Sequence, residues 1–471
     1  MTKMGALKHN LIGPKGFYKQ VVTILLPIII QNTVTNIVSL VDNVMVGSVG
    51  TLPMSAVAIV NQLLFVFYLG IFGGLSGAGI FTAQYHGACD SEGIRHTVRM
   101  KFYIALAVTL GAIAVLLLFP NQLVGMYLSE GTSAADAAVT LRHGKDYLYI
   151  MILGFLPFAL SQVYGSTLRE MGETRLPMLA SVVAILVNVV FNYVFIFGNE
   201  GLPFLPFEAM GVSGAAVATV MARYVEMAIV FVAVHKNKKK YEFVNGLYRS
   251  FKIPVKLCRE IFKKGAPLLI NEMLWSMGMA ALVQCYSVRG IEVVAATNIT
   301  STVSNIFSVV YLSMGSAIAI MVGQQLGANK IEEAKTTVWR LLALSVVTCA
   351  VMGGLLFAVS PLVPMMYNTS EAVRDMAMRL MWLVCLFMPF QALAHGSYFA
   401  LRSGGKTIIT LLFDSGFMWL GSYAVAYCVA HFTDLHILPF FALVQSIEAV
   451  KALVALVLVK KGIWINNIIN E

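Results

Sequence analysis

Residues 341–370 read LLALSVVTCAVMGGLLFAVSPLVPMMYNTS and contain no Asp, Glu, Lys or Arg. Two further stretches, 102–129 and 293–329, are equally free of these residues. An apolar segment of about 18 residues or more is long enough to cross a bilayer as a helix. The uncharged stretches therefore predict an all-α polytopic membrane protein.

The composition supports the same class. Hydrophobic residues make up 58% of the 471-residue chain and charged residues 12%, whereas an ordinary soluble domain is about 25% charged. This balance excludes a soluble enzyme, a disordered protein and a fibrous protein. The net charge of +10 does not indicate a nucleic-acid partner, because surplus Lys and Arg in a membrane protein usually mark cytoplasmic loops.

The apolar stretches and the turn residues between them, such as Gly50 and Pro53, predict twelve transmembrane helices. Transmembrane β-strands are excluded, because no series of segments alternates over about ten residues. The predicted helices cover residues 18–48, 54–86, 100–120, 146–170, 176–198, 211–235, 264–289, 293–326, 338–366, 374–402, 407–431 and 437–460.

The basic residues predict the orientation of these helices. Of the 33 Lys and Arg residues, 26 fall in loops on the same side as the N-terminus and five on the opposite side. Basic loops stay in the cytoplasm, so both termini are expected there, in a plasma membrane of the bacterial type.

The chain is a tandem repeat. QYHGACDSEGIRHTV at 84–98 matches QQLGANKIEEAKTTV at 324–338, and the same shift of 240 residues pairs Pro27 with Pro267. Each half has an even number of helices and enters the membrane from the same side. We therefore expect two parallel six-helix lobes related by a pseudo-twofold axis normal to the membrane, with the ligand path between them.

This repeat divides the chain into an N-terminal lobe at 1–235, a linker at 236–263 and a C-terminal lobe at 264–471. The linker region, KNKKKYEFVNGLYRSFKIPVKLCREIFKK at 236–264, is strongly basic. We expect it to lie in the cytoplasm, with an amphipathic surface helix that contacts anionic lipid.

Acidic residues within the predicted helices mark candidate functional positions. An ionised carboxylate facing lipid at the centre of a bilayer costs about 2.5–3.5 kcal/mol on insertion scales. These side chains must therefore face water, a partner or a proton. The five acids are Asp42, Glu226, Glu272, Asp414 and Glu448.

Asp42 is the strongest of these candidates. Asn188 and Asn192 are four residues apart and share one helix face, and Thr219 lies on the next predicted helix. At 1.5 Å per residue, Asp42, Asn192 and Thr219 all lie roughly 9–12 Å below the outer surface. One carboxylate, two amides and a hydroxyl predict a site for Na⁺ or a proton. The alternative is a hydrogen-bonded cluster that only joins helices.

The C-terminal lobe offers a second group. Glu272 and Asp414 both lie about 11 Å above the inner surface, and Trp275 is one turn from Glu272. An acid beside an aromatic ring suits organic cations. The alternative is an acid that pairs within the bundle, with Arg402 as a candidate partner.

Spacing along the helices suggests local partners for two further acids and a bend at one proline. Glu226 has Arg223 three residues before it, and Glu448 has Lys451 three residues after it, so local ion pairs are expected. Pro27 interrupts the first predicted helix 15 residues before Asp42, which makes it a candidate hinge.

Several motifs resemble those of the multidrug and toxic compound extrusion (MATE) family across nearly the whole chain. They are LVDNVMVGSVG at 40–50, TLREMGETRLPM at 167–178, NVVFNYVFIFG at 188–198, GVSGAAVAT at 211–219 and ALRSGGKT at 400–407. The resemblance implies two six-helix lobes around a central cleft.

The resemblance also implies roles for individual residues. Asp42, Asn188, Asn192 and Thr219 match the cation site of the family's first lobe, although one archaeal-type pattern has Asp where Asn192 stands. Another branch of the family uses acids on its seventh and tenth helices. Near those positions this chain has Glu272, about one turn away, and Gln391. Asp414 on the eleventh helix is more similar to the DinF-like branch.

We therefore expect a monomeric secondary antiporter that exports amphipathic organic cations while H⁺ or Na⁺ flows inward, with no cofactor beyond that ion. A flippase for lipid-linked oligosaccharides, from the same superfamily, is one alternative, but the acids in the cleft disfavour an anionic headgroup. An intramembrane serine protease is another. GLSG at 74–77 has the form G-x-S-G, and His86 or His395 would be its base. Such a short motif is weak evidence for an enzyme.

Overall fold

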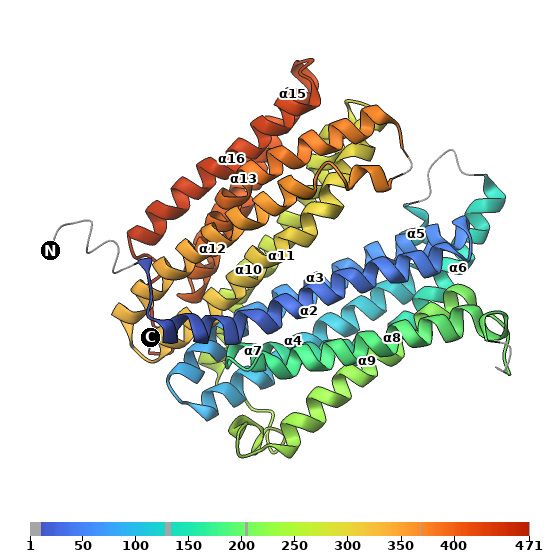
Figure 1. Cartoon of the computed structure of the whole chain (residues 1–471). Coiled ribbons are helices and arrows are strands. Elements are labelled where there is room, and N and C mark those ends of the chain that lie inside the picture. Colours follow the sequence, from blue (N-terminus) through green and yellow to red (C-terminus); the bar gives the residue numbers. More distant parts are fainter. Residues whose placement is uncertain (1–10, 128–132, 203–205, 368, 471) are drawn as a thin grey trace.

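The computed structural model describes residues 11–127, 133–202, 206–367 and 369–470, and it is built from helices (Figure 1). The helices of the first half form what we call the first bundle. They are α2 (Lys15–Gly47), α3 (Thr51–Gly87), α4 (Ser91–Leu118), α5 (Pro120–Gly125), α6 (Ala134–Ile152), α7 (Phe155–Glu170), α8 (Arg175–Gly201) and α9 (Gly211–Lys236).

The helices of the second half form the second bundle. They are α10 (Val255–Ser287), α11 (Ile291–Gly327), α12 (Ile331–Val359), α13 (Glu371–Ser403), α14 (Thr407–Gly416), α15 (Ala424–Phe432) and α16 (Ile437–Lys460). Three short elements complete the described chain: the 3₁₀ turns η1 (Glu242–Val244) and η2 (Pro364–Met366), and the π-helical segment η3 (Phe417–Tyr423), which joins α14 to α15.

Within the described residues, eleven helices are long and apolar enough to cross a membrane, and the bent pair α6 and α7 makes a twelfth when it is counted as one span. The predicted twelve-span architecture is therefore confirmed. The fourth span differs from the prediction, which had one helix over 146–170. Its two parts meet at a bend of 47°. Gly154 caps α7, and Pro157 in the first turn of α7 has no N–H to continue the ladder from α6.

The two bundles are close together at one end of the molecule and diverge at the other (Figure 1). The start of α2 and the end of α16 lie at the end at which the bundles meet, and we call it the closed end. The opposite end is called the open end.

Backbone conformation repeats between the halves. Positive φ angles recur at Gly50 (138°) and Gly290 (109°), which precede α3 and α11. They also recur at Gly172 (84°) and Gly405 (70°), in the turns before α8 and α14. Glycine adopts such angles without a steric cost. The duplication read from the sequence therefore also fixes the turn geometry of both bundles.

The first helix of each half crosses to the opposite bundle at the closed end. In α2, Val21 and Ile28 belong to the hydrophobic core of the second bundle, whereas α2 also packs along α8 of the first bundle. In α10, Ile261 and Leu268 pack against Phe81 of α3. Both helices continue through an internal proline, at Pro27 and Pro267. The two bundles are thus joined by a reciprocal exchange of helices.

Reciprocal contacts also join the bundles at the closed end. Gln84 of α3 donates to the carbonyl of Ser403 at 3.0 Å, and Gln324 of α11 donates to the carbonyl of Glu170 at 2.8 Å. A Cβ atom on Gly87 would lie 1.9 Å from the carbonyl oxygen of Gln324. A Cβ atom on Gly327 would lie 1.9 Å from that of Gln84. Only glycine allows α3 and α11 to approach this closely.

The basic linker, residues 236–263, is packed against the first bundle over part of its length and is called the strap below. Phe243 and Leu247 are buried in the core of the first bundle. The guanidinium of Arg99 on α4 donates to the carbonyls of Gly246, Leu247 and Lys252 at 2.8–3.2 Å.

The end of the linker differs from the expectation. Residues 255–263 are the start of α10, so they extend a transmembrane helix instead of forming a separate surface helix. Pro254 is the N-cap residue of α10, with φ −56° and ψ 129°, and the helix begins directly after it. Lys240, outside the membrane-spanning helices, forms an ion pair with Glu173, and this hydrogen bond raises the pKa of the ammonium above its usual value.

Candidate functional site

The structure brings Asp42, Asn188, Asn192 and Thr219 together between α2, α8 and α9. Asn192 donates from Nδ2 to Asp42 Oδ1 at 2.6 Å. When the amide nitrogen of Asn188 faces the carboxylate, it lies 3.0 Å from Oδ1 and 3.2 Å from Oδ2 of Asp42, and its oxygen accepts from Thr219 Oγ1 at 3.2 Å. Residues four apart on a helix share a face, which explains why both amides reach one carboxylate.

One buried oxygen of this cluster accepts no hydrogen bond from the described residues. Asn192 is 1% exposed, and its Oδ1 has no hydrogen-bond partner among the described residues. A buried polar atom without a partner is costly unless water or an ion satisfies it. Asp42 is only half-buried, so its carboxylate is reachable from solvent. The cluster therefore offers carboxylate and amide oxygens, the ligand type that hard cations prefer.

Within the described part of the chain, no Lys or Arg forms an ion pair with Asp42. Arg223 interacts with Asp42 through its charge, but its ion pair is with Glu226 at 3.4 Å. Glu226 is buried and also accepts from Ser181 at 3.1 Å. The local pairing expected for Glu226 is thus confirmed, and Asp42 keeps amide partners.

A polar stripe on α11 was not identified from the sequence. Asn298, Ser301, Thr302 and Asn305 are all exposed, although they lie in a helix long enough to cross the membrane. Their spacing of three, four and seven residues places them on one side of the helix. Polar residues at helical spacing within the uncharged stretch 293–329 are the sequence signal by which this stripe could have been found.

This stripe borders the space between the bundles. Ser313 of α11 accepts a hydrogen bond from Asn32 of α2 at 3.2 Å, so this side of α11 faces the first bundle. Thr302 lies eleven residues earlier, about three helical turns, and therefore on the same side. On α3, Asn61 and Gln62 are exposed at the positions related to Ser301 and Thr302 by the repeat. Exposed polar side chains on both bundles are typical of helices that border water instead of lipid.

The second-lobe candidates occupy separate places. Asp414 on α14 forms an ion pair with Lys451 of α16 at 2.7 Å and accepts from Asn271 at 3.0 Å. The Nζ atom of Lys451 is 3.9 Å from Glu448, so the local pair predicted from spacing is weaker than the long-range one. Arg402 was a candidate partner for an acid of this group, but among the described residues the ion pair of Asp414 is with Lys451. The helix of Lys451, α16, packs on η3, the segment that directly follows α14.

Glu272 and Trp275 lie on α10, and Glu272 faces the first bundle. A Cβ atom on Gly73 of α3 would be 3.4 Å from Glu272 Cγ, across the boundary between the bundles. Glu272 is half-buried, and Trp275 is 38% exposed. Gln391 donates to Gln445 at 3.1 Å inside the second bundle and is not brought to Glu272 by any described contact.

Ser76 does not have the geometry of a protease nucleophile. Its hydroxyl donates to the carbonyl of Phe72 at 2.6 Å. No histidine nitrogen is its partner among the residues that the structure describes. The G-x-S-G motif is explained by helix packing, since a Cβ atom on Gly77 would lie 2.3 Å from the backbone of Gly265.

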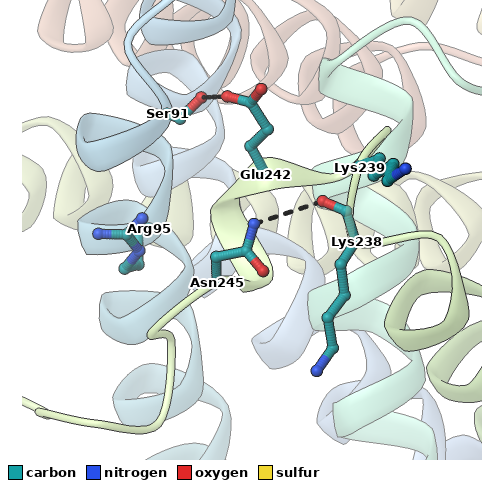
Figure 2. A pocket seen from close by; sticks show the side chains of 6 residues that line it. All are labelled: Ser91, Arg95, Lys238, Lys239, Glu242 and Asn245. Carbon is teal, nitrogen blue, oxygen red and sulfur yellow. Dashed lines mark hydrogen bonds between the residues drawn. The ribbon is translucent and has the colours of Figure 1, made fainter.

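A hollow of about 520 Å³ lies outside the spans, between α4 and the linker. Figure 2 shows that Ser91 donates to Glu242 there, while the charged ends of Arg95, Lys238 and Lys239 point in different directions. Because these cations do not converge, the hollow does not form a defined anion site.

Comparison with known proteins agrees with this architecture. Residues 27–194 and 267–427, more than half of the chain, match the protein family described as MatE. Two curated relatives are described as "Probable multidrug resistance protein NorM". The protein from Bacillus subtilis is 27% identical over 422 residues, which cover 88% of this chain and 89% of the relative. The protein from Thermotoga maritima is 23% identical over 429 residues, which cover 89% and 87%.

A solved structure has the same fold. It is described as the outward-facing conformation of a multidrug resistance MATE family transporter of the MOP superfamily. The TM-score is 0.82 at 19% identity, and the alignment covers 96% of this chain and 97% of that structure.

Proposed function

Because the chain belongs to the MatE family of membrane transporters, we propose that it is a secondary active antiporter. It exports amphipathic organic cations in exchange for inward H⁺ or Na⁺. The observation that carries the proposal is the cluster around Asp42, in which a half-exposed carboxylate and the unpartnered Oδ1 of buried Asn192 share one site. Two relatives whose printed names describe multidrug resistance proteins support the export of drugs.

The distribution of basic residues supports a cytoplasmic position for the closed end, since 26 of 33 Lys and Arg residues belong to loops on the side of the termini. In this orientation the open end faces the outside of a bacterial-type plasma membrane. A cation then reaches Asp42 from outside and leaves to the cytoplasm after the bundles rearrange.

The membrane potential provides the driving force. Each charge that moves down 100 mV contributes about 2.3 kcal/mol, which corresponds to roughly a fiftyfold concentration ratio of the exported compound. Asp42 couples the two movements if it holds the cation in one state of the bundles and releases it in the other.

Glu272 and Trp275 support recognition of the exported cation in the second bundle. A carboxylate attracts the positive charge, and the face of an indole ring stabilises it further. The position of Asp414 supports the finer placement near the DinF-like branch. A monomer satisfies this proposal, because both bundles of the pathway come from one chain.

The test is drug uptake into everted membrane vesicles under an imposed pH gradient and, separately, a sodium gradient. We expect one of the two gradients to drive uptake in the wild type, and Asp42→Asn to reduce the rate at least tenfold. Glu292→Gln removes an exposed carboxylate in the first turn of α11 and is the matched control, which should transport normally. Uptake that is independent of both gradients, or unchanged in Asp42→Asn, contradicts the proposal.

A further inference from the structure

The second bundle contains a buried charged group that the proposed transport cycle does not use. Lys451 of α16 is 7% exposed, and its ammonium donates to Asp414 Oδ1 at 2.7 Å. Asn271 of α10 donates to the other carboxylate oxygen at 3.0 Å. Ser415 donates to Asn271 Oδ1 at 2.7 Å and fixes the orientation of that amide. One oxygen of Asp414 thus accepts from an ammonium, and the other accepts from an amide held in place by Ser415.

This arrangement parallels the cluster of the first bundle in its chemistry. Asp42 and Asp414 each accept hydrogen bonds from an asparagine amide on a neighbouring helix. The difference lies in the remaining partner. Among the described residues, the hydrogen-bond donors to Asp42 are amides, Arg223 acts on it through charge without an ion pair, and Asn192 Oδ1 is left unpartnered. Asp414, in contrast, accepts a hydrogen bond from the ammonium of Lys451.

We propose that Lys451 is a tethered cation that occupies a monovalent-cation site of the second bundle, so that this bundle takes no exchangeable coupling ion. The inference rests on the proposed antiport function and specifies it. The coupling ion then binds at one place, the Asp42 cluster. Because Lys451 occupies the second site, only the ions bound at Asp42 are exchanged in each cycle.

The donor set around the ammonium supports this assignment. Nζ lies 2.7 Å from a carboxylate oxygen of Asp414 and 3.9 Å from one of Glu448. Oxygen ligands of this kind suit a hard cation as well as an ammonium. A buried carboxylate needs a compensating positive charge or a proton. A lysine provides that positive charge and, unlike a free ion, cannot dissociate, because its side chain is covalently part of the protein.

Other charged and titratable groups lie near the pair. Glu272 and His395 interact electrostatically with Asp414, and Arg402 interacts with both of them. Tyr311 of α11 lies near Glu448 and Lys451, and Tyr398 of α13 accepts from Asn271 at 3.3 Å. None of the acids in this group forms an ion pair with Arg402 within the described residues, so Lys451 is the cation bonded to Asp414.

The experiment counts ions bound to the full-length purified protein in detergent. Sodium binding is measured by equilibrium binding of ²²Na⁺, and proton binding by a pH indicator on acidification. We expect about one saturable site in the wild type. Lys451→Met should add about one site per chain, as Na⁺ or as a proton, because Asp414 is left without its counter-ion. In the Asp42→Asn background the added site should be the one that remains.

Matched variants separate charge from folding. Lys451→Met combined with Asp414→Asn removes both charges and should add no site. Lys460→Met removes an exposed lysine at the end of the same helix and should leave binding unchanged. If Lys451→Met does not yield monodisperse protein, Lys451→Gln retains a hydrogen-bond donor toward Asp414 and replaces it.

Three results overturn the inference. The first is no additional site in folded Lys451→Met or Lys451→Gln. The second is two saturable sites in the wild type. The third is a site that remains in Asp42→Asn and is lost on Asp414→Asn, with Lys451 still present, and this result needs no lysine variant. Failure of the antiport proposal looks different, because it leaves the wild type without a site that depends on Asp42.

Discussion

At the scale of the residue, the cluster around Asp42 is distinguished by an incomplete set of hydrogen bonds. Asn192 uses its Nδ2 toward Asp42 and leaves its Oδ1 without a partner among the described residues. Glu226, by contrast, is buried with an arginine and a serine as partners. A satisfied acid holds helices together, whereas an unsatisfied oxygen next to an accessible carboxylate can bind a ligand.

This difference leads to a prediction for Asn192. Asn192→Ala removes both the amide donor to Asp42 and the free oxygen. A hydrogen bond to a charged group contributes about 1.5–3 kcal/mol, so the apparent affinity for the coupling ion should fall about tenfold to a hundredfold. The measurement is the ion concentration that gives half-maximal drug uptake in vesicles.

The control for Asn192 lies beyond a kink in α8. Asn199 follows Gly198, where the backbone leaves the helical conformation (φ 51°), and its side chain is exposed. Asn199→Ala should therefore keep the wild-type ion dependence. Equal effects of the two substitutions would remove Asn192 from the ion site and leave the cluster with a purely structural role.

At the scale of the element, α3 and α11 make the contacts that hold the two bundles together at the closed end. They approach through Gly87 and Gly327 and are fastened by Gln84 and Gln324. Gln84 is completely buried, and besides Ser403 it contacts the C-terminal segment. Its Nε2 donates to the carbonyl of Asn466 at 3.1 Å, and its Oε1 accepts from the N–H of Ile468 at 2.9 Å. Opening of this end must break all these bonds together.

We predict that Gly327→Ala weakens the closed end. The added Cβ atom would lie 1.9 Å from the carbonyl oxygen of Gln84, which is backbone and cannot rotate away. Overpacking of this kind costs about 1–3 kcal/mol, and the free energy of unfolding in a denaturant titration should fall by that amount.

Gly111→Ala is the comparison for this element. Gly111 lies in α4, where an added Cβ atom meets nothing within 4 Å. Alanine favours a helix by up to about 1 kcal/mol over glycine, so this variant should be neutral or more stable. A Gly327→Ala protein as stable as Gly111→Ala would show that α3 and α11 adjust without cost.

The first helix of each half has a second role at this scale. The beginning of α2 packs on the second bundle, and α2 also packs along α8 of the first. Pro27 lies within the part that crosses between bundles and is buried there. A helix is weakened at an internal proline because one backbone hydrogen bond is missing. This position supports the proposed hinge at Pro27, since movement of the bundles must bend or slide the crossing helix.

At the scale of the whole molecule, the two bundles share a closed end, which also carries the start of α2, the end of α16 and the packed linker. Arg99 holds the strap on α4 through three carbonyls. If this end lies in the cytoplasm, as the basic residues predict, the open end accepts ions from outside. The direction of transport therefore depends on how the molecule is oriented in the membrane.

Cys89 provides a probe of that orientation. It is exposed in the turn between α3 and α4, at the closed end. A membrane-impermeant maleimide should label Cys89 in everted vesicles and not in intact cells. Cys89→Ser should abolish this labelling and confirm the site of reaction. Cys428 is exposed as well, so the decisive result is labelling of intact cells that is lost in Cys89→Ser. That result would reverse the orientation and, with it, the direction of ion flow in the proposed cycle.

The sequence by itself determined the properties that depend on local spacing. Uncharged stretches and basic loops predicted the twelve spans. The repeat predicted the two bundles. Residues four apart on one helix face, such as Asn188 and Asn192, indicated a common site with Asp42. These inferences held because helix geometry relates spacing to position directly, and because hydrocarbon excludes unpaired charge.

Only the tertiary structure decided which long-range partners meet. It selected Asp414 over Glu448 as the closer partner of Lys451, exchanged the first helices between the bundles, bent the fourth span and packed the linker as a strap. Helical spacing does not contain this information, because it describes positions within one helix. The choice between two acids for one lysine depends on which helices pack side by side.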